Sequence, residues 1–553
     1  MVWENMRIFA ERMQTSDKMD TNDMALLSGS QPDGMDEDKI KYPLSNQTFE
    51  KIITDRKVYV DKTELVYRMT HNYDYVFLSR PRRFGKSLLC STLASYFRGD
   101  RELFKGLAIE KLEKEWKRYP VIHLSLASVK GNTIPEIDES ISNRLKEIER
   151  EFGLQRESNG HGERLRDIIL QCHEQYGEKV VIILDEYDAP LLNVLHEPEK
   201  LDEVRLTMRK LYSPLKESDP HLKFLFITGI SKFSQQSIFS EINNLKVISM
   251  LPEFATICGF TQQEVEENFQ YGIRRMAKRQ ELTVDEVVDR LRHTYDGYHF
   301  SAKAPGVYNP YSIVNAMSDG EFKNYWYSTG TPTFLVNMLK KFGTSISDIN
   351  GSEAAEDEFD APTENMQSVL PLFYQSGYIT IKDYQKESGV YTLGFPNKEV
   401  RTGLMNSLYP NYVSQNPFGK ATNIWKISEG FLNHDVELSM ATLQAFLAGI
   451  PYQDSRFDEN HWTQMLYVVF SLLGIHVESQ VRTAKGRIDV VVKTKDDIYV
   501  MEVKLDRPAK EALEQIDDKG YLVPYTLDGR QLTKIGMSFS TEERTVTEWR
   551  INS

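Results

Sequence analysis

The sequence predicts an α/β protein with a parallel sheet in its front half and a second, smaller α/β domain at its C-terminal end. Four apolar runs separated by helical patterns lie between residues 75 and 228, an alternation typical of a parallel sheet. Near the end of the chain, the β-branched runs 488–492 and 498–503 flank a short polar segment and predict a hairpin. Helical patterns over residues 261–345 predict a lid behind the front sheet.

The loop after the first apolar run has the features of a phosphate-binding site. Residues 80–87 read Arg-Pro-Arg-Arg-Phe-Gly-Lys-Ser and lead into a helical pattern. In this context, backbone N–H groups and the helix N-terminus surround phosphate oxygens. We expect Gly85 and Lys86 to contact the phosphates, with Lys86 reaching the β- and γ-phosphates, and Ser87 to bind Mg²⁺.

Arg80 stands where such a loop usually has its first glycine, five residues before Gly85. Glycine there permits a tight turn. The sequence therefore predicts a different opening turn, partly fixed by Pro81, with Arg82 or Arg83 adding phosphate contact. The alternative interpretation is a basic turn in front of a core helix.

A second segment adds acidic groups to this site. Residues 180–184 suit a strand buried on both faces, and Asp185 and Glu186 follow directly. In a nucleotide site, Asp185 would hold Mg²⁺ directly or through water, and Glu186 would orient the attacking water. Thr228, near the end of a further apolar run, would supply a polar group beside the γ-phosphate. The alternative for Asp185 is an acidic cap on a buried strand.

The C-terminal hairpin carries two carboxylates and a lysine. Glu502 and Lys504 are two residues apart on one strand and share a face, and Asp489 approaches them from the neighbouring strand. Two carboxylates can hold Mg²⁺, which polarises a phosphate and acidifies water, while a lysine positions that water or steadies developing charge. This set predicts phosphodiester cleavage; the alternative is a charged hairpin edge.

The hairpin resembles the PD-(D/E)XK nuclease superfamily, and the similarity extends beyond the two strands. Glu459 opens an amphipathic stretch where that superfamily often has an acid on its first helix. Gln515 lies on a following predicted helix, where many members carry a glutamine. The resemblance implies a restriction-endonuclease-like domain with Asp489 and Glu502 as metal ligands and with Lys504, Glu459 and Gln515 in the catalytic site.

The chain as a whole resembles a bacterial family that joins an AAA-ATPase-like domain to a C-terminal PD-(D/E)XK nuclease domain. In that family the phosphate loop commonly has the form seen here, so Arg80 is a family trait. The resemblance implies a P-loop NTPase-like sheet with ATP and Mg²⁺ as cofactors. It also implies nucleic acid as the partner, with DNA favoured over RNA. It rests on residues 42–44, 49–52, 59–63, 80–87, 185–188, 228–234, 295–298, 308–310 and 329–332.

Composition restricts the class further. A chain of 553 residues with 40% hydrophobic content should hold several domains with real cores. It has no run of eighteen apolar residues, so no membrane span is expected. The N-terminus lacks the features of a signal peptide, and three cysteines without metal-like spacing fit a reducing cytoplasm. The net charge of −14 means that DNA contact would need a local basic patch.

The expected organisation has six parts. They are a mobile tail (1–40), an AAA-ATPase-like domain (41–260), a helical lid (261–350), an acidic linker (351–365), a mixed α/β connecting region (366–450) and a nuclease-like domain (455–553).

Two functions fit these motifs. The first is an ATP-regulated nuclease, and the second is a switch NTPase whose C-terminal fold binds nucleic acid or a partner without cutting. Loss of both activities is less favoured, because the phosphate loop, the Asp-Glu pair and the hairpin set are all present. The sequence leaves self-association open.

Overall fold

The computed structural model divides the chain into two compact units. Unit 1 comprises Met1–Trp326 and Glu353–Glu399, and unit 2 comprises Tyr327–Ser352 and Val400–Ser553. The structure describes residues 40–44, 46–129, 131, 133–195, 197–232, 242, 244–327, 333–344, 346–363, 366–412, 420–448, 459–473, 476–483, 486–543 and 545–552. The predicted tail therefore lies almost wholly outside the described residues.

Unit 1 is built on the predicted parallel sheet. Its five strands are in the order β2-β3-β4-β1-β5, and every pairing is parallel. β3 is buried along its whole length, as expected for a central strand covered on both faces. The strands are β1 (Tyr75–Ser79), β2 (Val121–Ser125), β3 (Val180–Asp185), β4 (Leu222–Gly229) and β5 (Lys246–Val247).

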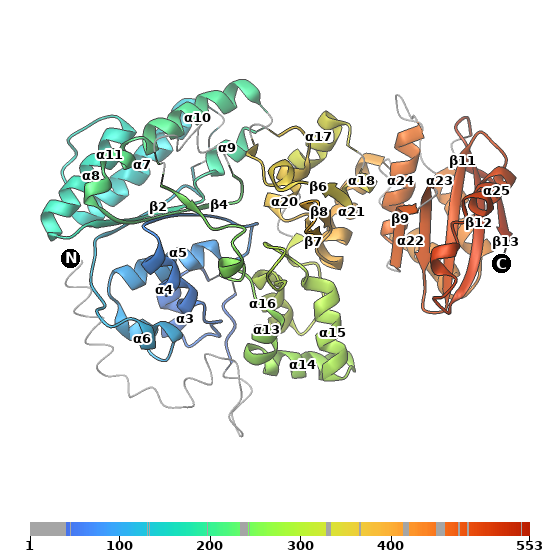
Figure 1. The fold of residues 1–553 in the computed structure, drawn as a ribbon, viewed down its shortest axis with the longest axis horizontal. Coiled ribbons are helices and arrows are strands. Elements are labelled where there is room, and N and C mark those ends of the chain that lie inside the picture. Colours follow the sequence, from blue (N-terminus) through green and yellow to red (C-terminus); the bar gives the residue numbers. More distant parts are fainter. Residues whose placement is uncertain are drawn as a thin grey trace. The chain divides into compact units, whose positions relative to one another are not determined.

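Helices cover both faces of this sheet. In Figure 1, α3–α6 lie on one face, and α7, α8, α10 and α11 lie on the other. α7 shows why such helices form: a capping box at Thr133 starts it, and its buried residues recur every three or four positions. The helices are α3 (Phe49–Thr54), α4 (Thr63–Asn72), α5 (Lys86–Phe97), α6 (Ala108–Leu112), α7 (Ile134–Phe152), α8 (His161–Tyr176), α9 (Ala189–Asn193), α10 (Pro198–Tyr212) and α11 (Pro214–Glu217).

The helices of the expected lid form a cluster with its own core. It consists of α13 (Gln262–Asn268), α14 (Gln270–Gln280), α15 (Val284–Tyr295) and α16 (Pro310–Asp319). Residues of these helices pack with Val58 and Val60 from the N-terminal part of unit 1. Two further helices within the expected lid range belong to unit 2: α17 (Thr333–Phe342) and α18 (Ile346–Ile349).

The acidic stretch is folded and not a linker. It contains β6 (Ser352–Ala354) and α19 (Glu356–Phe359), and β6 joins β7 (Thr380–Gln385) and β8 (Val390–Gly394) in a small sheet. Phe359 is fully buried, and Asp360 forms an ion pair with Lys232 beyond β4. The expected connecting region is also divided: α20 (Leu370–Ser376), β7 and β8 lie in unit 1, whereas most of α21 (Lys398–Tyr412) lies in unit 2.

Unit 2 contains the predicted hairpin in a five-stranded mixed sheet of order β13-β12-β11-β10-β9. β10 and β11 pair antiparallel, which confirms the hairpin. Val500 packs in a cluster with Ile516 of α25, whereas the adjacent Tyr499 contacts Phe431 of α22. Because successive side chains on a strand point to opposite faces, helices cover both faces of this sheet. The elements are α22 (Lys420–Leu432), α23 (Val436–Ala448), α24 (Glu459–Ser471), β9 (His476–Thr483), β10 (Gly486–Lys493), β11 (Asp497–Leu505), α25 (Ala509–Lys519), β12 (Gln531–Ser540) and β13 (Thr545–Asn552).

Each helix in the described ranges is too short or too polar to pass through a lipid bilayer.

Candidate functional sites

The phosphate loop, residues 80–87, connects β1 to α5. Gly85 caps α5 in the left-handed region at φ 90°, a conformation that favours glycine. The Lys86 ammonium donates hydrogen bonds to the carbonyl oxygens of Arg80 (2.9 Å) and Pro81 (3.0 Å) and is thereby held inside the loop. Burial lowers the pKa of Lys86, while the nearby charges of Glu186 and Asp185 oppose that shift.

Ser87 and Asp185 meet at the carboxyl edge of the sheet, as expected for a magnesium–nucleotide site. The Ser87 side chain hydrogen-bonds the Asp185 carboxylate, and burial raises the pKa of Asp185. Asp185 is 3% exposed, and no donor among the described residues reaches its Oδ1. A buried carboxylate oxygen without a partner is costly unless a cation or water completes it, so this residue pair fits Mg²⁺.

Glu186 and Asp188 border the same site. Glu186 has φ 51°, a left-handed conformation that costs energy in a non-glycine residue and is found most often at functional sites. Asp188 is buried, and its Oδ2 accepts hydrogen bonds from the backbone of Ile230 (3.0 Å) and from the backbone (2.7 Å) and hydroxyl (2.6 Å) of Ser231. Asp188 therefore ties the turn after β3 to the turn after β4.

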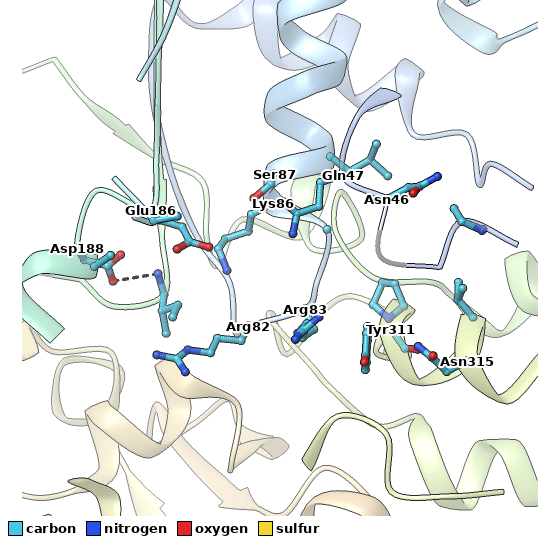
Figure 2. Close-up of a pocket in the computed structure, with 18 of the residues that line it drawn as sticks. Asn46, Gln47, Arg82, Arg83, Lys86, Ser87, Glu186, Asp188, Tyr311 and Asn315 are labelled. Carbon is cyan, nitrogen blue, oxygen red and sulfur yellow. Dashed lines mark hydrogen bonds between the residues drawn. The ribbon is translucent and has the colours of Figure 1, made fainter. Parts of the chain in front are cut away.

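These groups open into a cavity of about 480 Å³, within the size range of small-molecule sites. Figure 2 shows Glu186 and Asp188 on one side of Lys86 and the α16 residues Tyr311 and Asn315 on the other. The sequence predicted the end of the cavity formed by Lys86 and Glu186, but not the opposite end. Its polar groups are Asn46, Gln47, Tyr311 and Asn315.

The three arginines and the phenylalanine of the loop divide into two pairs: Arg80 and Phe84 are buried, and Arg82 and Arg83 are exposed. Arg80 is 1% exposed: its guanidinium donates to the carbonyls of Ser249 (2.8 Å) and Phe254 (3.1 Å) and lies 4.0 Å from the Phe300 ring centroid. Burial lowers the pKa of Arg80 to about 10, so it stays charged at neutral pH. Phe84 is equally buried.

The two central arginines, Arg82 and Arg83, are exposed and line the cavity. The Arg83 guanidinium lies 4.4 Å from the centroid of the Tyr311 ring, a cation–π distance. The structure thus supports an opening turn that needs no glycine: Arg80 is a buried anchor, and Arg82 and Arg83 are the arginines available to a ligand.

Thr228 is not brought to the cavity. It is a fully buried residue of β4, and its hydroxyl donates to the carbonyl of Leu78 on the neighbouring β1 at 2.7 Å. Its position does not match the expected polar group beside the γ-phosphate. Ile230, two residues on, lines the cavity instead.

A thiol and an imidazole lie behind Asp185. One ligand atom each of Cys90, His123 and Asp185 lie within 4.8 Å of one another. Burial raises the pKa of Cys90 and lowers that of His123 to about 4, so both are neutral at pH 7. Asp185 also bonds Ser87, which lines the cavity, so this cluster lies directly behind a cavity residue.

In unit 2, the hairpin and α25 bring four predicted residues together. Lys504 lies 3.4 Å from Oε1 of Glu502, which confirms that the two share a face. Gln515 of α25 donates from its amide nitrogen to Oε1 of Glu502, and its amide oxygen accepts from Lys504. Asp489 turns toward the neighbouring strand, where its Oδ2 accepts from the backbone N–H of Val503 at 2.9 Å.

The ionised form of Glu502 is electrostatically unfavourable in this site. Glu502 is 3% exposed, and burial together with the nearby charge of Asp489 raises its pKa to about 7, while Lys504 opposes the shift. No donor in the described part of the chain reaches Oε2 of Glu502. Two adjacent carboxylates, one of which has an unpartnered oxygen, suit a divalent cation. Such an ion would offset the repulsion between the carboxylates and would bind the unpartnered oxygen.

Glu459 is the first residue of α24, but its side chain lies outside the described residues. Its expected role therefore stays a prediction. Tyr521, which sequence reasoning missed, places its hydroxyl 3.4 Å from the amide nitrogen of Gln515. A tyrosine six residues after a helical glutamine gives no sequence signal of such a contact.

Comparisons with known proteins cover the two regions of the chain that contain these sites. A family model described as predicted AAA-ATPase matches residues 43–239, and a model of the PD-(D/E)XK nuclease superfamily matches residues 457–549. An uncharacterized protein in the vnfD 5′ region of Azotobacter chroococcum mcd 1 is 32% identical over 526 residues, covering 93% of this chain and 99% of that protein.

Proposed function

Because this chain belongs to the family that joins a predicted AAA-ATPase domain to a C-terminal PD-(D/E)XK nuclease-superfamily domain, we propose that it is an ATP-binding protein that regulates its own Mg²⁺-dependent nuclease. Nucleic acid, DNA in the first instance, is the proposed substrate. The observation that carries the nuclease half is the buried Glu502, which has a bare oxygen beside Asp489 and lies within reach of Lys504.

At the nuclease site, Asp489 and Glu502 would hold Mg²⁺. When bound, the ion supplies positive charge that polarises a phosphodiester oxygen and acidifies water. Lys504 is placed to steady the charge that develops on the phosphate. Gln515 fixes the geometry of both side chains, since its amide contacts Glu502 with one atom and Lys504 with the other.

At the nucleotide site, Lys86 and the backbone N–H groups at the start of α5 would bind the phosphates. Ser87 and Asp185 would hold Mg²⁺, which neutralises phosphate charge when bound. Glu186 would orient the attacking water. Arg82 and Arg83 would add positive charge from the cavity wall. The side-chain amides of Asn46, Gln47 and Asn315 would contact the nucleotide base.

Plasmid cleavage with Mg²⁺, measured with and without ATP, tests the proposal. Wild type should cleave, and the nucleotide should change the rate. Asp489→Ala and Glu502→Ala should each abolish cleavage without unfolding the protein, because an Mg²⁺ site with one carboxylate fewer binds weakly. Lys504→Ala should keep metal binding and lose most of the rate. Lys510→Ala, on the exposed side of α25, is the matched control.

The second candidate is a switch NTPase whose C-terminal domain binds nucleic acid without cutting it. It is favoured by the Lys504 ammonium, which Gln515 and Glu502 both engage within the protein. ATP binding together with DNA binding, but no cleavage in Mg²⁺ or Mn²⁺, would select this candidate.

A further inference from the structure

One buried carboxylate joins two of the places where the chain passes from unit 1 to unit 2. Glu399 is the last residue of unit 1, and Trp326 is the last residue before the first crossing. Glu399 Oε1 accepts a hydrogen bond from the backbone N–H of Trp326 at 2.8 Å. Glu399 is 1% exposed, so the first and third crossings leave unit 1 from residues held by the same buried group.

Trp326 also contacts the phosphate loop. Its indole N–H donates to the carbonyl oxygen of Arg82 at 3.1 Å. The ring packs against Tyr378, with 5.2 Å between ring centroids, and the residue is 7% exposed. The backbone carbonyl of a cavity-lining arginine is therefore bonded directly to the residue at the first crossing.

The second oxygen of Glu399 reaches the opposite wall of the cavity. Glu399 Oε2 accepts from the hydroxyl of Ser312 at 2.7 Å, and Ser312 lies in the first turn of α16. Its neighbours Tyr311 and Asn315 line the cavity. One glutamate thus bonds α16 directly and the phosphate loop through Trp326.

We propose that Glu399 and Trp326 are positioning residues that hold the phosphate loop and α16 together and transmit nucleotide binding to the first and third chain crossings. Neither residue lines the cavity, so each acts through a group that does. The transmission part rests on the proposed nucleotide site, whereas the positioning part does not. The two contacts of Glu399 are buried and the indole contact is partly buried, so losing one leaves a donor or acceptor poorly satisfied.

Hydrogen exchange without nucleotide tests the positioning. Trp326→Phe removes the indole N–H and keeps the ring, and Ser312→Ala removes one contact of Glu399. Loss of one hydrogen bond should speed exchange about fivefold, at residues 80–87 in the first variant and in the first turn of α16 in the second. Trp425→Phe, at a 60% exposed tryptophan of α22, is the control. Unchanged exchange in both variants would overturn the positioning.

Exchange with a non-hydrolysable Mg²⁺–ATP analogue tests the transmission. In wild type, the analogue should slow exchange over residues 321–327 and 398–404. In Glu399→Ala this response should be lost while β3 stays protected; if that variant does not fold, Trp326→Phe should show loss at 321–327. Calorimetry on the same samples separates the two claims. No binding contradicts the proposed nucleotide site, and binding without a response at either crossing overturns the transmission.

Discussion

Gln515 donates a hydrogen bond from its amide nitrogen to Oε1 of Glu502. The same amide accepts from Lys504 through its oxygen, so one side chain sets the spacing of a carboxylate and an ammonium. The orientation leaves Oε2 of Glu502 without a donor among the described residues. A glutamine suits this task because its amide carries a donor and an acceptor at fixed separation.

Replacing Gln515 by alanine should therefore reduce cleavage by about 10–100-fold, the range found when a group that orients a metal ligand is removed. Mg²⁺ binding should weaken as well, because Glu502 loses its fixed rotamer. Initial cleavage rates over a Mg²⁺ titration measure both effects. Gln531→Ala, at an exposed position at the start of β12, should behave as wild type. A Gln515→Ala protein with the wild-type rate would show that the amide only packs.

Lys86→Ala should weaken ATP binding strongly, since it removes a buried ammonium from the phosphate loop. Glu186→Gln should bind ATP as wild type and hydrolyse it slowly, because the amide cannot orient water as a base would. Calorimetry gives the affinities, and phosphate release gives the rates. Lys105→Ala, at an exposed lysine outside the cavity, serves as the control. Equal affinity of wild type and Lys86→Ala would disprove the nucleotide site.

The loop arginines should separate into structural and ligand-binding groups. Arg80→Ala should destabilise unit 1 by about 3 kcal/mol, because it leaves several buried carbonyls without a donor and opens a cavity under Phe300. Arg82→Ala and Arg83→Ala should leave stability nearly unchanged and weaken ATP binding. Urea unfolding and calorimetry distinguish these outcomes. The prediction fails if Arg82→Ala and Arg83→Ala both bind ATP as tightly as wild type.

Glu399 should make the stability of unit 1 depend on pH. Burial raises its pKa from 4.5 to about 7, so between these values the folded protein holds a proton that the unfolded chain has lost. The contribution is fully present below about pH 4.5 and is lost as the pH rises through about 7, an effect on the order of 3 kcal/mol.

Glu399→Gln should remove this titration. Urea unfolding at about pH 5 and about pH 8 should then show a smaller stability difference in the variant than in wild type. Glu387→Gln, at an exposed glutamate between β7 and β8, should keep the wild-type difference. Identical pH dependence in wild type and Glu399→Gln would mean that Glu399 is ionised in the folded protein throughout this range.

The sheet and the phosphate end of the cavity were predictable because their signals are local. A run such as residues 180–184 is apolar at every position and suits a strand covered on both faces, which the structure has there. Parallel strands end at one edge, so Lys86, Ser87, Asp185 and Glu186 were expected at that edge. The hairpin pairing likewise follows from short-range pattern.

The rest depends on contacts between distant segments. Asn46 and Tyr311 line one cavity although more than half of unit 1 separates them in the sequence. The acidic stretch 353–360 looks solvated, yet a single aromatic, Phe359, and the ion pair of Asp360 fix it to unit 1. An isolated buried aromatic residue shows no periodicity, so no sequence pattern reveals it. The expected place of Thr228 beside the cavity differs from the structure for a related reason. Only the sheet register shows that its hydroxyl faces Leu78.

The buried anchors of the phosphate loop bear on how this protein can evolve. Phe84 stacks edge-on against Tyr298 and Phe300, with centroid distances of 4.8 and 5.3 Å, and Arg80 lies over Phe300. The loop is therefore completed by aromatic residues more than two hundred positions later in the chain. Recombination that separated the loop from residues 298–300 would strip its support, so the two segments must be inherited together. A chain cut at residue 260 would keep the whole loop and lose the aromatic residues that Phe84 and Arg80 pack against.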